Sequence, residues 1–138
     1  MIELLVVISI IGILTTLVAA NLNSARGRAR DAQRKSDLKN ISTALRLYYN
    51  DKSRYPIAAS LPWGSQWSSG TTVYMSTLPN DPLPDQTYKY QLGTDTDPSD
   101  TDNFRLSACL ENKSDTSGKS ITISGWTCDS GWVFQTKP

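Results

Sequence analysis

The sequence predicts an α+β protein, in which one long N-terminal α-helix packs against a small antiparallel β-sheet of three or four strands. Residues 1–50 contain no proline and only two glycines, and apolar side chains recur at helical spacing along them. After residue 85, several short runs alternate apolar and polar side chains between turn-forming residues. The first observation predicts the helix, and the second predicts the sheet.

The composition excludes several classes of function. The chain has 138 residues, a net charge of +1 and no histidine. The near-neutral charge favours no particular partner. The lack of histidine removes the commonest general base, the commonest metal ligand and any Ser-His or Cys-His pair. Because no other nucleophile–base pair or metal-ligand cluster is evident, we expect a protein that is not an enzyme.

The first helical segment is apolar. Leu4 to Ala20 is a run of seventeen residues without a formal charge, at the short end of a membrane-spanning helix. A cleavable signal would begin with basic residues and have a shorter apolar core, whereas Glu3 stands at the edge of this run. A membrane anchor fits the length better. A carboxylate at its edge needs an explanation, because burying it in hydrocarbon costs about 3 kcal/mol or more.

The helical pattern continues beyond the apolar run. Leu38, Ile41, Leu45 and Tyr48 form one stripe, of which we expect Ile41, Leu45 and Tyr48 to contact the sheet. Asp31 with Lys35 and Arg34 with Asp37 have the spacing of ion pairs within a helix. A helix that ends near Asn50 would be roughly 75 Å long, more than twice the ~30 Å of a bilayer's hydrocarbon core. We therefore expect an apolar half, residues 1–23, and a globular domain, residues 24–138, that includes the outer half of the helix, residues 24–50.

The rest of the chain predicts a loop and then strands. Residues 51–85 are rich in serine, glycine and proline and predict a long loop, in which Trp63 and Trp67 either pack on the helix or bind a ligand at the surface. Residues 86–138 predict an antiparallel meander. Its strands are expected in QTYKYQL, NFRLSACLE, KSITIS and GWVFQ.

Two cysteines lie near the C-terminus. Eighteen residues separate Cys109 from Cys128, a spacing that fits neither a CxxC redox motif nor a four-ligand zinc site. A disulfide is the favoured interpretation and predicts an oxidising, extracytoplasmic location. Two buried thiols in a cytosolic protein are the alternative. The basic residues between Arg26 and Lys35 would hold the domain in the cytoplasm, so we expect a basic leader that preceded Met1 and was removed after export.

Four aspartates gather between the first two predicted strands of the sheet. Asp95, Asp97, Asp100 and Asp102 could ligate Ca²⁺, but the segment has neither the glycine nor the glutamate of an EF-hand loop. A solvated acidic turn is the favoured interpretation. We expect no cofactor, with calcium as the alternative, and weak calcium binding or none.

The stretch MIELLVVISIIGIL resembles the N-terminal helix of bacterial type IV pilins and of the pseudopilins of type II secretion. Residues 20–56 resemble the rest of that family's long helix and the loop that leaves it, and the later strands and cysteine pair match its general plan. Glu3 aligns with the family's N-terminal glutamate and Gly12 with its helix glycine, which implies roles in assembly and in helix flexibility. Ala20 stands where the family often has a proline.

The resemblance implies a structural function. The chain is expected to be the major subunit of a type IV pilus, held in the inner membrane and then polymerised into a helical cell-surface filament of identical subunits. A prepilin peptidase, N-methylation and a pilus assembly machinery are implied with it. In the filament, Glu3 would pair with the N-terminal ammonium group of a neighbouring subunit. Adhesion, motility, DNA uptake and secretion are not distinguished.

Two alternative functions remain. A type II secretion pseudopilin is favoured by the acidic loop, and a membrane-tethered binding module would use the tryptophans or that loop. A nucleic-acid partner is not expected, because the basic residues from Arg26 to Lys35 surround the helix and alternate with Asp31 and Asp37. Salt bridges between subunits or contacts with lipid headgroups are the expected roles of these basic residues.

Overall fold

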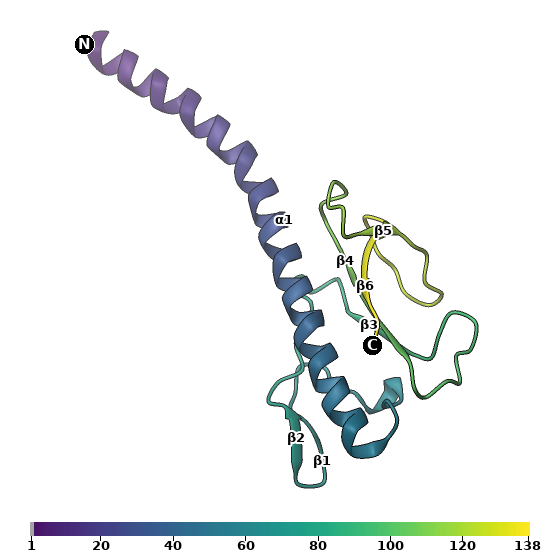
Figure 1. Ribbon diagram of the computed structural model, residues 1–138. Helices are drawn as coiled ribbons and strands as arrows, with labels where there is room; N and C mark the ends of the chain where they lie inside the picture. Colours follow the sequence, from purple (N-terminus) through teal and green to yellow (C-terminus); the bar gives the residue numbers. More distant parts are fainter. Residues whose placement is uncertain (1) are drawn as a thin grey trace.

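The computed structural model describes residues 2–138, except for the side chains of residues 17–20. One long helix, α1, leads into six short strands and a 3₁₀ turn (Figure 1). The bounds are α1 (Ile2–Lys52), η1 (Ala58–Ser60), β1 (Trp67–Ser69), β2 (Thr72–Met75), β3 (Lys89–Leu92), β4 (Phe104–Cys109), β5 (Lys119–Ser120) and β6 (Trp132–Thr136). The predicted α+β fold class is confirmed.

The helix α1 has two different environments along its length. Its N-terminal part projects away from the strands, whereas its C-terminal part packs against β2, β4 and β6 (Figure 1). The helix ends at Lys52, two residues beyond the expected end. Ser53 adopts a left-handed φ of 53° and donates its N–H to the carbonyl of Tyr49 at 2.7 Å. This is the geometry of a helix C-cap, and Pro56 soon after cannot continue the helix.

The core forms where the outer half of α1 meets the larger sheet. Ile41 and Leu45 of the predicted contact stripe are fully buried, and so is Leu38, whereas Tyr48 is only partly buried and stacks on Trp67. Facing them is the row of alternate side chains of β4 and its extension, which is also buried and consists of Phe104, Leu106, Ala108 and Leu110. Apolar side chains at helical spacing on α1 and at alternate positions on β4 therefore form two apolar faces that pack together.

The strand order differs from the expected meander. The larger sheet is antiparallel in the order β3-β4-β6-β5, so the last strand, β6, lies between β4 and β5. Of the run KSITIS, only Lys119 and Ser120 form a strand, and both are exposed. The longer β6 contributes the buried Val133. Placing it beside β4 buries more apolar surface, and the short polar strand is left at the edge.

Residues 51–85 are not only a loop, as the sequence had suggested, because β1 and β2 form a separate antiparallel hairpin there. Gly70, with a φ of 63°, lies in the two-residue turn between the strands. Trp67 is buried and stacks on Tyr48 of α1 with ring centroids 5.4 Å apart, and Tyr74 of β2 lies against the same two rings. Aromatic packing on the helix therefore stabilises this hairpin, which its short and mostly polar strands did not predict.

Candidate functional site

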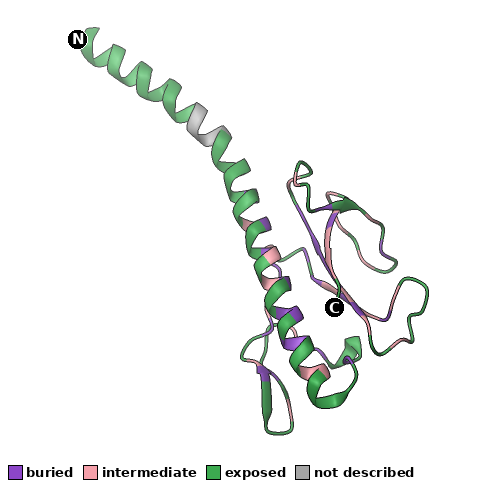
Figure 2. Ribbon diagram, in the orientation of Figure 1, coloured by how far each residue is buried: buried purple, intermediate pink, exposed green. Residues whose placement is uncertain are grey.

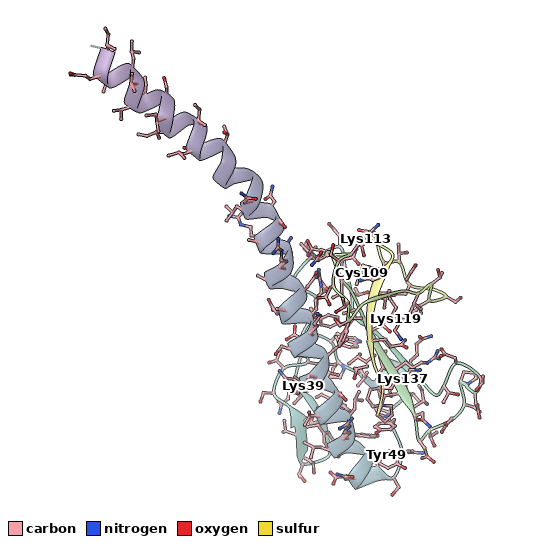
Figure 3. All side chains as sticks on the ribbon, turned by 45° about the horizontal axis from the view of Figure 1, so that its top comes forward. Lys39, Tyr49, Cys109, Lys113, Lys119 and Lys137 are labelled. Atoms are coloured by element: carbon pink, nitrogen blue, oxygen red, sulfur yellow. A yellow bond between two sulfur atoms is a disulfide. The ribbon has the colours of Figure 1, made fainter. Side chains whose placement is uncertain are left out.

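The described side chains in the apolar half of α1 are exposed on all sides of the helix. Between Ile2 and Leu14 every large apolar side chain has more than half of its surface exposed, from 51% at Val6 to 78% at Ile2. Figure 2 shows this segment as exposed along its described length, and Figure 3 shows its side chains pointing away from the helix axis in all directions. By length and composition α1 is apolar enough to cross a membrane. An apolar surface of this kind needs lipid or a protein partner.

The hydroxyl groups of this segment bond within the helix. Ser9 donates to the carbonyl of Leu5 and Thr15 to that of Ile11, both at 2.7 Å, and Thr16 donates to Ile13 at 2.8 Å. These bonds satisfy the hydroxyl donors without water, which suits an apolar environment. Among the polar side chains of residues 2–16, Glu3 is therefore the one without a described hydrogen-bond or ion-pair partner.

Glu3 lies in the first turn of α1, where the helix dipole favours a negative charge. None of the ion pairs in the described part of the chain includes it. Gly12 lies further along the exposed segment, and a Cβ placed there would meet nothing within 4 Å. No described contact within the subunit therefore requires a glutamate at position 3 or a glycine at position 12. The roles of the two residues in assembly and helix flexibility stay predictions.

At the base of the exposed segment, a buried arginine joins the helix to the globular domain. The Arg34 side chain is fully buried, and its Nε and Nη2 atoms bond the two carboxylate oxygens of Asp81, each at 2.8 Å. Its Nη1 donates to Asp31 and to Glu111, also at 2.8 Å. Burial disfavours the charged guanidinium, but these three carboxylates outweigh that effect and raise the pKa of Arg34 above its ordinary value.

Further ion pairs extend this cluster. Asp31 also accepts the backbone N–H groups of Glu111 and Asn112, at 2.9 Å each. Arg30 bonds both carboxylate oxygens of Glu111, at 2.7 and 2.6 Å, and the hydrogen bond from Arg30 lowers the pKa of that carboxyl. The hydrogen bond from Lys35 lowers the pKa of Asp115 to about 2. The helix is thus tied to the segment that follows β4.

The predicted pairs within the helix are therefore wrong. Lys35 contacts Asp115 instead of Asp31, and Arg34 contacts Asp31 instead of Asp37. Asp37 accepts a hydrogen bond from the Tyr88 hydroxyl at 2.8 Å. Arg30, Arg34 and Lys35 thus form ion pairs within their own subunit. Contacts of the basic segment with neighbouring subunits or lipid headgroups stay a prediction. Sequence spacing along the helix could not reveal partners that lie 47 to 81 positions away.

The four aspartates between β3 and β4 face different partners. Asp95 pairs with Arg105, and Asp97 accepts from the backbone and hydroxyl of Ser99, at 2.9 and 2.6 Å. Asp100 accepts from Asn103 at 2.7 Å, and Asp102 accepts from the Tyr49 hydroxyl at 3.1 Å. No group of three or more acidic, cysteine or histidine side chains in the described residues could hold a metal ion. The expectation of little or no calcium binding stays a prediction.

Cys109, at the end of β4, and Cys128, in the segment before β6, are joined by a disulfide. The bond ties the segment before β6 to the strand beside which β6 lies. It therefore covalently links the last part of the chain to the centre of the larger sheet.

One comparison with known proteins is informative. A stretch of 55 residues, 40% of this chain, is 34% identical to a protein of Myxococcus xanthus strain DK1622 described as the type IV major pilin protein PilA. The match supports a pilin-like relationship, and it spans a quarter of that relative's length. No family model matches the chain, and no solved structure matches it.

Proposed function

We propose that this protein is the major structural subunit of a type IV pilus or a closely related filament, and that it polymerises through residues 1–23. The observation that carries the proposal is the exposed apolar segment of α1 from Ile2 to Leu14, which projects away from the strands. Bundled apolar halves of many copies would bury this surface, while the globular domains form the outside of the polymer. The similarity to a major pilin supports the same function.

Glu3 supports polymerisation over simple membrane anchoring. An anchor needs only an apolar surface, and a carboxylate within it is a cost of about 3 kcal/mol or more unless a partner compensates the charge. In a bundle of identical subunits, the N-terminal amine of a neighbour shifted along the axis would supply that partner. Glu3 would then determine the axial position at which each new subunit is added.

The ion-pair cluster around Arg34 would serve the polymer by orienting the domain on the helix. Four short hydrogen bonds from one buried guanidinium fix the outer half of α1 against the segments that contain Asp81 and Glu111. A domain held in one orientation on its helix presents the same surface in every subunit. A helical polymer requires such identical contacts.

The proposal includes a location and partners. The subunit would be held in the inner membrane by its apolar half, processed by a prepilin peptidase and moved into the filament by an assembly machinery. The disulfide fits a domain that folds outside the cytoplasm. The finished filament would lie at the cell surface.

The test is the substitution Glu3→Ala. We expect the variant to accumulate in the membrane fraction at normal abundance, because the apolar surface is unchanged, while filaments in sheared cell-surface material fall sharply. Electron microscopy and immunoblotting of sheared and membrane fractions measure both quantities. Glu3→Asp should give an intermediate yield, since its shorter side chain reaches the partner less well.

The matched control is Ser9→Ala. It also replaces a polar side chain of the apolar half with alanine, but the Ser9 hydroxyl is satisfied within its own helix, so we expect normal filaments. If Glu3→Ala filaments form at wild-type yield, the carboxylate is not the assembly partner. If the wild-type protein gives no polymer while it is present in the membrane, the chain is a tethered module.

A further inference from the structure

A pocket lies at the junction between the apolar half of α1 and the globular domain. It has a volume of about 420 Å³ and two walls. One wall consists of α1 residues between Asn23 and Arg28, and the other is the segment 111–113, which follows β4. The pocket therefore lies where the exposed apolar segment ends and the folded domain begins.

The pocket lies at the depth of lipid headgroups when the apolar segment spans a bilayer. A hydrocarbon core of about 30 Å requires about 20 helical residues, so a span that begins at Ile2 ends near Asn21. The headgroup layer adds roughly 5–7 Å on each side, or about four residues. The α1 wall of the pocket begins in this layer. Figure 3 shows Lys113 at the end of the domain from which the apolar half projects.

Arg28 directs its charge back toward the apolar segment. Its Nη2 donates to the Ser24 Oγ at 3.2 Å, one helical turn nearer the N-terminus. Side chains on a helix lean toward its N-terminus, so this direction follows from the geometry of α1. The guanidinium therefore lies at the level of Ser24, although the backbone of Arg28 is further from the hydrocarbon core.

The second wall of the pocket is held against α1. The backbone N–H groups of Glu111 and Asn112 both donate to Asp31 of the helix, at 2.9 Å each. Lys113 follows these two residues directly and also lines the pocket. Because its backbone is attached to a fixed segment, both cations border the pocket before any ligand binds. Binding would therefore cost little reorganisation of the backbone.

The pocket is positively charged. Its cations are Arg28 and Lys113, and its one carboxylate, Glu111, is already compensated by Arg30 and Arg34. A guanidinium and an ammonium group bind phosphate oxygens through charge-assisted hydrogen bonds. A cationic group on the ligand, such as choline, would meet no uncompensated carboxylate among the lining residues. The pocket therefore favours a phosphate group whose ligand carries no positive charge.

We infer that this pocket binds the phosphate of one anionic phospholipid, in the membrane leaflet next to the globular domain. The phosphate bonds Arg28, Lys113 and the Ser24 hydroxyl, and the acyl chains lie along the apolar segment of α1. A lipid held in this way fixes the domain at the membrane surface before assembly. The inference rests on the proposed function in one respect, which is that the apolar half is held in a membrane, and it does not require a polymer.

The test uses the full chain in micelles of a nonionic detergent. Phosphatidylglycerol and phosphatidylcholine with identical acyl chains are titrated, and native mass spectrometry counts the bound lipids. We expect one phosphatidylglycerol molecule to bind saturably and more tightly than phosphatidylcholine. Arg28→Gln and Lys113→Gln should each weaken its binding by about tenfold, the scale of one lost charge-assisted hydrogen bond. Inorganic phosphate, titrated separately, should bind far more weakly because it lacks acyl chains.

Two matched controls remove exposed cations outside the pocket. Arg26→Gln is the control for Arg28→Gln on α1, and Lys119→Gln in β5 is the control for Lys113→Gln. Both variants should bind phosphatidylglycerol nearly as tightly as the wild type. Near-ultraviolet circular dichroism verifies that every variant is folded.

Three results would overturn the inference. The first is equal affinity for the two lipids, and the second is a loss of affinity in Arg26→Gln as large as in Arg28→Gln, which would indicate diffuse attraction. The third is inorganic phosphate binding as tightly as the lipid. Filaments from a protein without selective lipid binding would refute this site alone, and selective binding by a protein that forms no filaments would refute polymerisation alone.

Discussion

At the scale of single residues, Arg34 and Glu3 are charged groups in opposite situations. Arg34 is fully buried, and three carboxylates of its own subunit compensate its charge. Glu3 is exposed, and no ion pair in the described chain includes it. The first charge therefore stabilises the subunit, whereas the second is available for an interaction between subunits.

Arg34→Met tests the role of the buried guanidinium. The substitution leaves Asp81 and Asp31 buried without a cation, and breaking a buried pair in this way costs about 3–5 kcal/mol. We expect a decrease of this size in the free energy of unfolding of the globular domain, measured by denaturant titration. Arg28→Met is the control, because Arg28 is exposed and its only described side-chain bond is to Ser24; its effect should be within about 0.5 kcal/mol. Equal effects of the two substitutions would contradict this assignment.

At the scale of the elements, local patterns predicted α1 and the contact between its apolar stripe and the sheet. These depend on side-chain period and on the positions of proline and glycine, which the sequence shows directly. The order of the sheet was not predictable, since β4 and β6 pair through contacts between distant segments. The hairpin of β1 and β2 was missed because its strands have only three and four residues in a polar stretch.

The candidate site divides in the same way. The cysteines were predicted from their number and position, and the structure joins them. Glu3 and Gly12 were predicted from a local motif, and their roles stay predictions. The cluster around Arg34 was not found, because Asp81 and Glu111 come from distant segments and charged residues on a helix ordinarily face solvent.

The disulfide belongs to this scale because it connects two elements. Replacing both Cys109 and Cys128 by alanine should lower the free energy of unfolding by about 3 kcal/mol, the value of the loop-entropy model for a loop of this size. The segment between β5 and β6 should exchange its amide hydrogens faster, while α1 is unaffected. Denaturant titration and hydrogen exchange measure the two effects. Masses of the native protein before and after reduction should differ by two protons, and two free thiols before reduction would contradict the prediction.

At the scale of the whole molecule, the chain has two parts. The globular domain buries its apolar side chains and pairs its buried charges within the subunit, whereas the apolar half of α1 does neither in its described residues. The globular domain has a core, an ion-pair cluster and a disulfide. The described side chains in the apolar half of α1 are exposed. Gly27 is the first residue of α1 that is described as buried, and a Cβ added there would lie 3.4 Å from Glu111 Oε2. The boundary between the two parts therefore lies shortly before Gly27.

This division predicts the outcome of truncation. Deleting residues 1–23 should give a soluble, folded monomer, because the deletion removes exposed apolar surface but leaves Arg34, Leu38 and the rest of the contact stripe in place. Circular dichroism, analytical ultracentrifugation and thermal unfolding would measure the fold, the association state and the stability. A longer deletion, of residues 1–36, is the matched control: it also removes Asp31 and Arg34, so Asp81 and Glu111 lose their partner and the domain should unfold or aggregate. Insolubility of the shorter truncation would mean that the apolar half contributes to folding of the domain, and a folded product of the longer one would mean that the ion-pair cluster does not stabilise it.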